Sequence, residues 1–266
     1  MNKTNEVWKE KVQQCLETPD YVSKPRGMEV HEVLNGSYSV PMPAYLDYEE
    51  RDVNVNFMFA EAAWIVSGSN KLSEVSRHMK KYADFSDDGL FLRGAYGPKV
   101  VDQIGYVADS IIKDNDTRQA VMTIWRERPA PSKDIPCTVA MQFLLRDNKL
   151  NMVTTMRSND IILGFTYDVF TFSMVAAALQ RILKAGGLDV ELGTLFVNAG
   201  SLHLYESHYK KAEEYLKAET TDNRTKELVD YVLENSPTYE SLIKNLNTVA
   251  DNYDKDFNPD DPENWV

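Results

Sequence analysis

The spacing of apolar and polar residues predicts a chain that mixes helices with strands. Residues 1–20 place Val7, Trp8, Val12 and Leu16 on one face of an amphipathic helix. Further helices are expected at residues 56–66, 71–81, 99–113, 168–184, 207–217 and 223–233. Strands are expected at about 28–40, where apolar and polar residues alternate, and near 119–126, 138–146, 149–157 and 190–198. This mixture predicts an α+β domain built on a large mixed or antiparallel sheet packed with helices.

Two turn-rich segments interrupt these elements. Residues 82–98 contain Asp87-Asp88-Gly89 and Tyr96-Gly97-Pro98 and predict a loop or lid, whereas residues 146–149 predict a hairpin turn. No linker rich in Gly, Ser or Pro divides the 266 residues, which suffice for one large domain or two small ones. We expect a single domain over residues 1–266, with a helical and acidic extension at 218–266.

The composition narrows the class of protein. A net charge of −12 argues against direct binding of nucleic acid, because Lys and Arg supply most of the non-specific affinity for phosphate. Cys15 and Cys137 are the only cysteines, which excludes a disulfide framework and indicates a reducing cytoplasm. The polar start lacks a signal run, and no apolar run is long enough to span a membrane.

Several short motifs, each weak alone, follow one another along the chain. They are Glu61-Ala62-Ala63-Trp64 with Gly68-Ser69-Asn70, Asp116-Thr117-Arg118, Pro136-Cys137, the stretch from Met156 to Asp168, and Gly200-Ser201-Leu202-His203-Leu204-Tyr205. Together they resemble the motifs of the thymidylate synthase family over about residues 25–217. The resemblance implies the fold of that family and a homodimer with shared active sites.

Asp168 relates the chain to one branch of the family. An Asn at this position would read uracil, whereas a carboxyl group can accept a hydrogen bond from the N4 amine of cytosine. Asp168, Thr138 after Cys137, and Asn159 in Ser158-Asn159-Asp160 resemble viral deoxycytidylate hydroxymethylases. We therefore expect dCMP as the pyrimidine nucleotide, and the cytoplasm of a host cell as the location if the protein is viral.

The expected reaction starts from the chemistry of Cys137. Pyrimidine C5 becomes nucleophilic once a thiolate adds at C6, and such a thiol needs a depressed pKa, which Arg157 and Arg118 could supply. The resemblance implies that C5 then attacks the one-carbon unit of 5,10-methylenetetrahydrofolate. Addition of water gives 5-hydroxymethyl-dCMP, which Thr138 favours, and hydride transfer gives 5-methyl-dCMP. Glu61, within an apolar helical stretch, is expected to be a buried acid with a raised pKa, useful for proton transfer.

The resemblance also implies the residues that bind substrate and folate. Arg157 and Ser158 would hold the phosphate from one subunit and Arg118 from the other, with Arg26 preferred to Lys24 as a third cation. His203 and Tyr205, two apart on a strand, would hold the sugar. The remaining candidates are Tyr96 near the nucleophile, Gln142 and Asp160 at the substrate, and Asn70, Asp160 and Gly164 at the folate.

The residues leave more than one function open at this point. Gln119 stands where the family commonly has a second Arg, so Arg126 or Arg128 would have to replace that cation. This change and the divergent segment 82–98 leave room for a catalytically silent nucleotide-binding or regulatory homologue. dUMP or CMP could be the substrate on the same scaffold. His203 and His208 lack a third ligand, so no metal site is expected.

Overall fold

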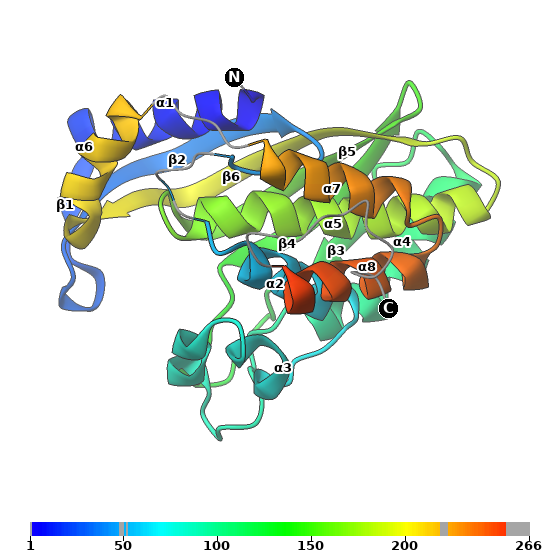
Figure 1. Cartoon of the computed structure of the whole chain (residues 1–266), viewed down its shortest axis with the longest axis horizontal. Coiled ribbons are helices and arrows are strands. Elements are labelled where there is room, and N and C mark those ends of the chain that lie inside the picture. The colour runs from blue at the N-terminus through cyan, green and yellow to red at the C-terminus, as the bar shows by residue number, and fades with distance from the viewer. Residues whose placement is uncertain (1, 48–50, 52, 219–222, 254–266) are drawn as a thin grey trace.

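A six-stranded sheet forms the centre of the computed structural model, which describes residues 2–47, 51, 53–218 and 223–253 (Figure 1). The strands lie in the order β1-β2-β6-β5-β4-β3, and neighbours are antiparallel except for the parallel pair β5 and β6. Their bounds are β1 Tyr21–Ser23, β2 Val30–Pro41, β3 Val121–Thr123, β4 Thr138–Arg146, β5 Lys149–Asp160 and β6 Glu191–Tyr205. The α+β class and the mixed sheet are confirmed.

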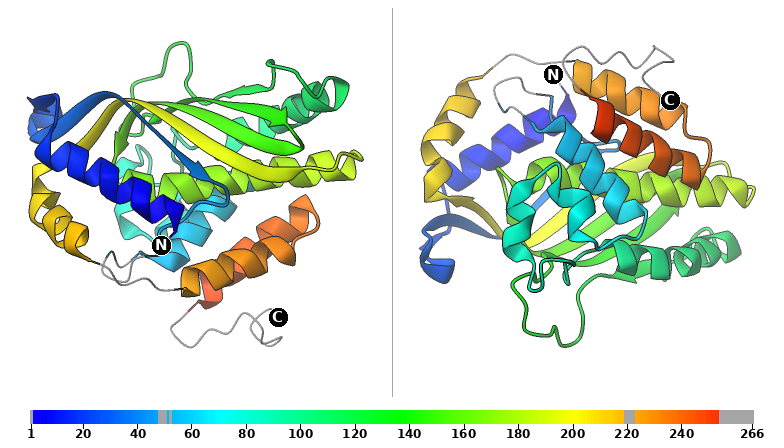
Figure 2. Two further views of the ribbon diagram at one scale, coloured as in Figure 1. Left: turned by 90° about the horizontal axis from the view of Figure 1, so that it is seen from above. Right: turned by 60° about the horizontal axis from the view of Figure 1, so that its bottom comes forward.

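Helices cover one side of this sheet. The α-helices are α1 Lys3–Glu17, α2 Val55–Val66, α3 Leu72–Ser76, α4 Gly97–Lys113, α5 Gly164–Ala185, α6 Tyr209–Lys217, α7 Arg224–Glu234 and α8 Tyr239–Asn252. Short 3₁₀ helices are η1 Pro25–Gly27, η3 Lys80–Phe85 and η4 Glu206–His208. Figure 2 shows α1, α5, α7 and α8 on the same side of the sheet. Helix α5 is buried along most of its length, because it lies between the sheet and α2.

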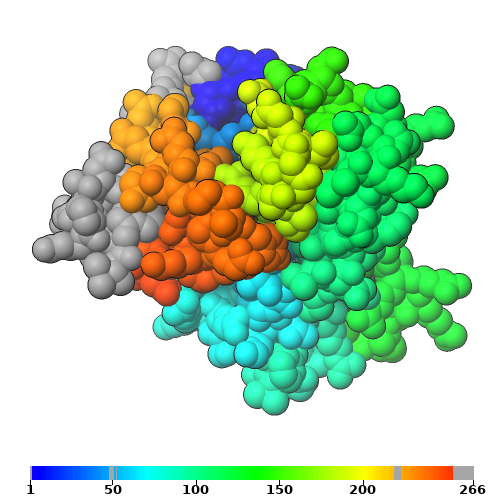
Figure 3. All heavy atoms as spheres, turned by 90° about the vertical axis from the view of Figure 1, so that its right-hand side faces the viewer, coloured from blue at the N-terminus to red at the C-terminus, as the bar shows by residue number. Residues whose placement is uncertain are grey.

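Polar contacts fix the helices at both ends of α5. The indole Nε1 of Trp8 donates to the carbonyl of Ile161 at 2.7 Å, which ties α1 to the turn before α5. Buried Arg181 donates to the carbonyls of Ser236 at 2.9 Å and Leu233 at 2.7 Å, which ties the far end of α5 to α7 and the turn before α8. Figure 3 shows these two helices on the surface beside the end of α5.

The opposite side of the sheet lacks a helical layer among the described residues. Paired positions form a row across it, from Ser39 through Phe196, Val153 and Gln142 to Val121. These residues are exposed or half-buried, and Phe196 is 41% exposed. The residues that alternate with them along β4, β5 and β6 point to the other face and are mostly buried, as expected for strands with one packed face.

Several predicted elements differ from the structure. The helix expected at 71–81 is only α3 followed by η3, and the strand expected at 119–126 is only β3. Helix α5 begins four residues earlier than predicted and β6 runs on to Tyr205, while β1 and α8 were not predicted. The hairpin turn is confirmed, since Asp147 and Asn148 have φ values of 49° and 60°. The acidic end of the chain, 254–266, lies outside the described residues. No described helix is long and apolar enough to cross a membrane.

Candidate active site

Cys137 lies in the segment that leads into β4, and neighbouring β5 supplies its polar partners. The Arg157 amide donates to the Cys137 carbonyl at 2.8 Å, and the Ser158 hydroxyl lies 3.7 Å from the sulfur. The Arg157 guanidinium donates to the carbonyls of Pro136 and Ile135, each at 3.0 Å, and to the Ser158 hydroxyl at 2.9 Å. The pairing of β4 with β5 therefore places a cation and a hydroxyl next to the thiol.

The expectation of a depressed thiol pKa is wrong for the single chain. Burial raises the pKa of Cys137, and the opposing effects of Arg157 and the Ser158 hydrogen bond are smaller. Arg118, the other expected cation, is exposed beyond the β3 edge, where its carbonyl accepts from Gln142 at 2.9 Å. In a single chain, burial therefore outweighs the nearby cation in setting the pKa of Cys137. Cys15 is fully buried, and burial raises its pKa to about 12.

Tyr96 lies beside Cys137, at the start of α4. Its hydroxyl accepts from the Thr138 amide at 3.2 Å, and the charge of Cys137 contributes, after burial, to its raised pKa. The predicted loop 82–98 is bonded to residues 132–134, which follow in the chain after a loop that projects from the molecule in the right-hand view of Figure 2. The Gly94 amide donates to Asp134 at 2.7 Å, and the Lys133 amide donates to Asp87 at 3.1 Å. These contacts fix the segment that carries Tyr96.

Asp168 lies one turn into α5 and is held by a buried amide. The Asn159 Nδ2 donates to the Asp168 Oδ2 at 2.7 Å, and the Tyr38 hydroxyl donates to the Asn159 Oδ1 at 3.0 Å. Asn159 is 1% exposed. A Cβ on Gly164 would lie 3.1 Å from that Nδ2 and 3.2 Å from the same carboxylate oxygen, so Gly164 leaves room for the pair. The sequence analysis assigned no role in the site to Asn159. The available signal was its place between Ser158 and Asp160 on a strand, which puts its amide on the opposite, buried face.

Glu61 and Asp168 are two acids in one buried region. The hydroxyls of Tyr82 and Thr171 donate to Glu61, the latter at 3.4 Å. Burial outweighs these bonds and raises the pKa of Glu61 to about 7, which confirms the expected direction. Burial and then the charge of Glu61 raise the pKa of Asp168 well above its usual range. Burial thus makes both acids harder to ionise than free carboxyl groups, and the charge of Glu61 adds to this effect at Asp168.

The candidate sugar-binding pair lies at the end of β6. The rings of His203 and Tyr205 are 5.1 Å apart and face the same side of the strand. Parallel pairing sets His203 opposite Asp160 on β5. Arg26 donates to the Tyr205 hydroxyl at 3.5 Å, whereas Lys24 pairs with Glu29 at 3.2 Å. Of these two cations, Arg26 therefore contacts Tyr205, whereas Lys24 pairs with an acid.

The remaining candidates are distributed differently. Asp160 accepts from the amides of Ile162 at 2.8 Å and Leu163 at 3.0 Å, so one carboxylate oxygen caps the turn into α5. Asn70 is half-buried and joins residue 92 through its carbonyl. Gln142 lies in the middle of β4, roughly 16 Å along the strand from Cys137. Gln142 belongs to the row of residues on the uncovered side of the sheet, and its side-chain amide donates to the backbone carbonyl of Arg118.

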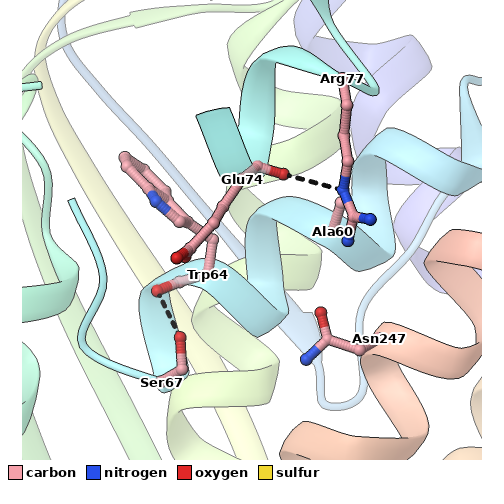
Figure 4. A pocket seen from close by; sticks show the side chains of 6 residues that line it. All are labelled: Ala60, Trp64, Ser67, Glu74, Arg77 and Asn247. Atoms are coloured by element: carbon pink, nitrogen blue, oxygen red, sulfur yellow. Dashed lines mark hydrogen bonds between the residues drawn. The ribbon is translucent and has the colours of Figure 1, made fainter. Parts of the chain in front are cut away.

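A separate cavity of about 220 Å³ lies beside α2 and is lined by Ala60, Trp64, Ser67, Glu74, Arg77 and Asn247 (Figure 4). Arg77 is already bonded there to the Glu74 carbonyl at 3.3 Å and to Asp251 at 2.8 Å. None of the predicted substrate-binding residues lines it. Within the described ranges, no cluster of three or more His, Cys, Asp or Glu side chains could hold a metal ion.

Comparison with known proteins identifies relatives of the chain. A family profile described as thymidylate synthase matches residues 48–236. The chain is 28% identical over 261 residues to a deoxyuridylate hydroxymethyltransferase of Bacillus phage SP01, covering 87% of this chain and 67% of the relative. It is 24% identical over 229 residues to a deoxycytidylate 5-hydroxymethyltransferase of Enterobacteria phage T4, covering 81% and 92%. It spans only 54% of a 28% identical deoxyuridylate hydroxymethyltransferase of Delftia phage PhiW-14, with 68% of this chain aligned.

Proposed function

Because the chain belongs to the thymidylate synthase family and is therefore a one-carbon transferase, we propose that it hydroxymethylates C5 of dCMP to give 5-hydroxymethyl-dCMP. The single observation that carries the choice of base is Asp168, held by Asn159 where the family reads the pyrimidine. The T4 relative, named for deoxycytidylate, supports this choice. The phage relatives also support a setting in the cytoplasm of a host, where Cys137 stays reduced.

In this proposal Cys137 adds to C6 of the pyrimidine ring. Binding of the substrate phosphate beside Arg157 and Ser158 holds the nucleotide, while their charge and hydrogen bond favour the thiolate. Asp168 holds the base edge. Glu61, with a pKa of about 7, can give or take a proton near neutral pH. Tyr96 anchors the Thr138 amide next to the nucleophile and so fixes the start of β4.

The one-carbon unit would come from 5,10-methylenetetrahydrofolate, which supplies carbon at the oxidation level of formaldehyde. The described residues fit an anionic carrier of this kind. Arg51 is buried and donates to the Ile162 carbonyl at 2.8 Å, and its Nε has no acceptor within the described part of the chain. Together with Asn70 and the backbone near Gly164, Arg51 would hold the folate.

The proposed enzyme is a homodimer in which each site uses both subunits. Gln142 belongs to the row of residues on the uncovered side of the sheet, and its side-chain amide donates to the backbone carbonyl of the exposed Arg118. Packing of two such faces would bring Arg118 to the partner's phosphate site. That cation would add the positive charge that the Cys137 thiol lacks in a single chain.

dUMP is the second candidate substrate, and a specific observation favours it. The raised pKa of Asp168 allows a neutral carboxyl group, which can donate to O4 and accept from N3–H of uracil. Three phage relatives are named as deoxyuridylate hydroxymethyltransferases. The same scaffold could also methylate dCMP, modify CMP, or bind a nucleotide without turning it over.

The test is incubation of the purified protein with methylenetetrahydrofolate and either dCMP or dUMP. The product mass separates hydroxymethyl from methyl transfer, and the ratio of kcat/KM gives the base preference. A covalent Cys137 adduct with a 5-fluoropyrimidine nucleotide and the folate would exclude a silent homologue. Absence of both product and adduct, in protein that still binds nucleotide, would favour the silent role.

A further inference from the structure

Asn159 joins a buried tyrosine to the acid that faces the base. Its Oδ1 accepts from the Tyr38 hydroxyl at 3.0 Å, and its Nδ2 donates to the Asp168 Oδ2 at 2.7 Å. Tyr38 is 7% exposed and Asn159 is 1% exposed, so water does not compete freely for either bond. The ring of Tyr38 packs on Phe165 at 4.8 Å between centroids, in the first turn of α5.

The Tyr38 hydroxyl decides which way the Asn159 amide points. Burial and the charge of Asp168 raise the pKa of Tyr38, so its hydroxyl keeps a proton that must be donated. Within the described residues, Asn159 Oδ1 is the acceptor for that proton. A flipped amide would direct N–H toward Tyr38 and leave the buried hydroxyl proton without an acceptor, at the cost of a desolvated donor. The amide therefore presents N–H to Asp168.

This orientation restricts the proton of Asp168. Oδ2 faces an N–H donor, and a second hydrogen between these two atoms has no room at 2.7 Å. The hydroxyl oxygen of a neutral carboxyl group is a weaker acceptor than its carbonyl oxygen, so the N–H of Asn159 favours Oδ2 as the carbonyl oxygen and the proton of neutral Asp168 on Oδ1. Without such a restriction a carboxyl group could read either base: cytosine offers an acceptor at N3 and a donor at N4, and uracil offers the reverse order.

We propose that Asn159, oriented by Tyr38, is a positioning residue that determines base specificity. It keeps the proton of Asp168 on Oδ1, so this carboxyl group pairs with the edge of one pyrimidine and rejects the other. The inference rests on the proposed function, in which Asp168 reads the base. With Oδ2 toward the exocyclic group and Oδ1 toward N3, the arrangement matches cytosine: Oδ1–H donates to N3 and Oδ2 accepts from the N4 amine. Uracil would meet a donor opposite its own N3–H and an acceptor opposite O4.

The test compares the kcat/KM ratio for dCMP over dUMP among three variants. Asn159→Ala removes both hydrogen bonds and frees the proton to move between the two carboxyl oxygens. The ratio should therefore fall about tenfold, toward unity. Tyr38→Phe keeps the amide but releases its orientation, and should change the ratio in the same direction by less. Asn5→Ala is the matched control, because Asn5 is an equally buried amide bonded to Asp47 elsewhere, and it should leave the ratio unchanged.

Equal losses for both nucleotides in Asn159→Ala, with an unchanged ratio, would overturn the inference and leave Asn159 a scaffold residue. If that variant does not fold, Tyr38→Phe, which loses a single hydroxyl, decides the question by the same ratio. A wild-type preference for dUMP would refute the proposed base. If the ratio in Asn159→Ala then still moved toward unity, the role of Asn159 would be supported, with Oδ2 of Asp168 facing N3 of uracil. If neither nucleotide turns over, the ratio of the two dissociation constants from calorimetry replaces kcat/KM.

Discussion

Replacement of Glu61 by Gln should change how stability depends on pH. Burial raises the pKa of Glu61 from 4.5 to about 7, although the hydroxyls of Tyr82 and Thr171 donate to it. The folded state therefore binds this proton more tightly than the unfolded state. The resulting stability is fully present below about pH 4.5 and is lost as the pH rises through about 7.

The magnitude follows from the two pKa values. A change from 4.5 to about 7 corresponds to roughly 3 kcal/mol of unfolding free energy, which is an upper bound because the Glu61 side chain is only partly buried by surface area. Gln keeps the size and an acceptor oxygen for Tyr82 but does not titrate. The charge of Glu61 also raises the pKa of Asp168, so its removal makes ionisation of Asp168 easier. We expect Glu61→Gln to gain about 1–3 kcal/mol over wild type between about pH 5 and about pH 8.

The assay is chemical denaturation of both proteins across this pH range, with exposed Glu213→Gln on α6 as the control. Subtraction of the two free energies at each pH removes the contributions of other titrating groups that the substitution does not touch. The difference in unfolding free energy between wild type and Glu213→Gln should not change with pH. Parallel curves for wild type and Glu61→Gln would show that Glu61 is solvated in the folded protein, and would refute the argument that burial holds its proton.

Three further outcomes test the proposed reaction. Cys137→Ala should abolish turnover while nucleotide binding, measured by calorimetry, survives; normal turnover would exclude Cys137 as the nucleophile. Mixing inactive Arg118→Ala with inactive Cys137→Ala should restore some activity, because mixed dimers would contain one site with both residues intact, and no recovery after confirmed subunit exchange would count against shared sites. Asp168→Asn should move the kcat/KM ratio from dCMP toward dUMP by roughly 5- to 150-fold, since a mismatched buried hydrogen bond costs about 1–3 kcal/mol; an unchanged ratio would mean that Asp168 does not read the base.

Periodicity predicted the long elements well and the short ones poorly. Helix α5 could be predicted because its apolar residues continue to the glycines at 186 and 187, but its start could not. The four residues before Asp168 become helical because Asp160 caps the turn and Trp8 holds Ile161, and both contacts involve tertiary structure. Helix α8 lies in a polar segment, so its apolar stripe, which packs on α2, was not recognised.

The motifs that resemble the thymidylate synthase family indicated Cys137, Arg157 and Asp168, and their roles stay predictions. The raised pKa of Glu61 could be predicted from its apolar surroundings in the sequence, whereas the raised pKa of Cys137 could not. The direction of the pKa shift at Cys137 depends on how deeply the thiol is buried and on which guanidinium groups lie near it in one chain. The motif around Cys137 predicts neither. The hydrogen bonds of Asn159 could not be predicted, because its partner Tyr38 is far away along the chain and meets it only in the folded protein.

The continuous segment Lys149–Tyr205, which contains β5, α5 and β6, gathers several of the expected recognition groups. Arg157, Asp168 and His203 belong to it, whereas Cys137, Glu61 and the expected cations Arg26 and Arg118 come from earlier parts of the chain. Substitutions confined to this segment would therefore act on the expected base and sugar contacts without replacing the expected nucleophile or the acid Glu61.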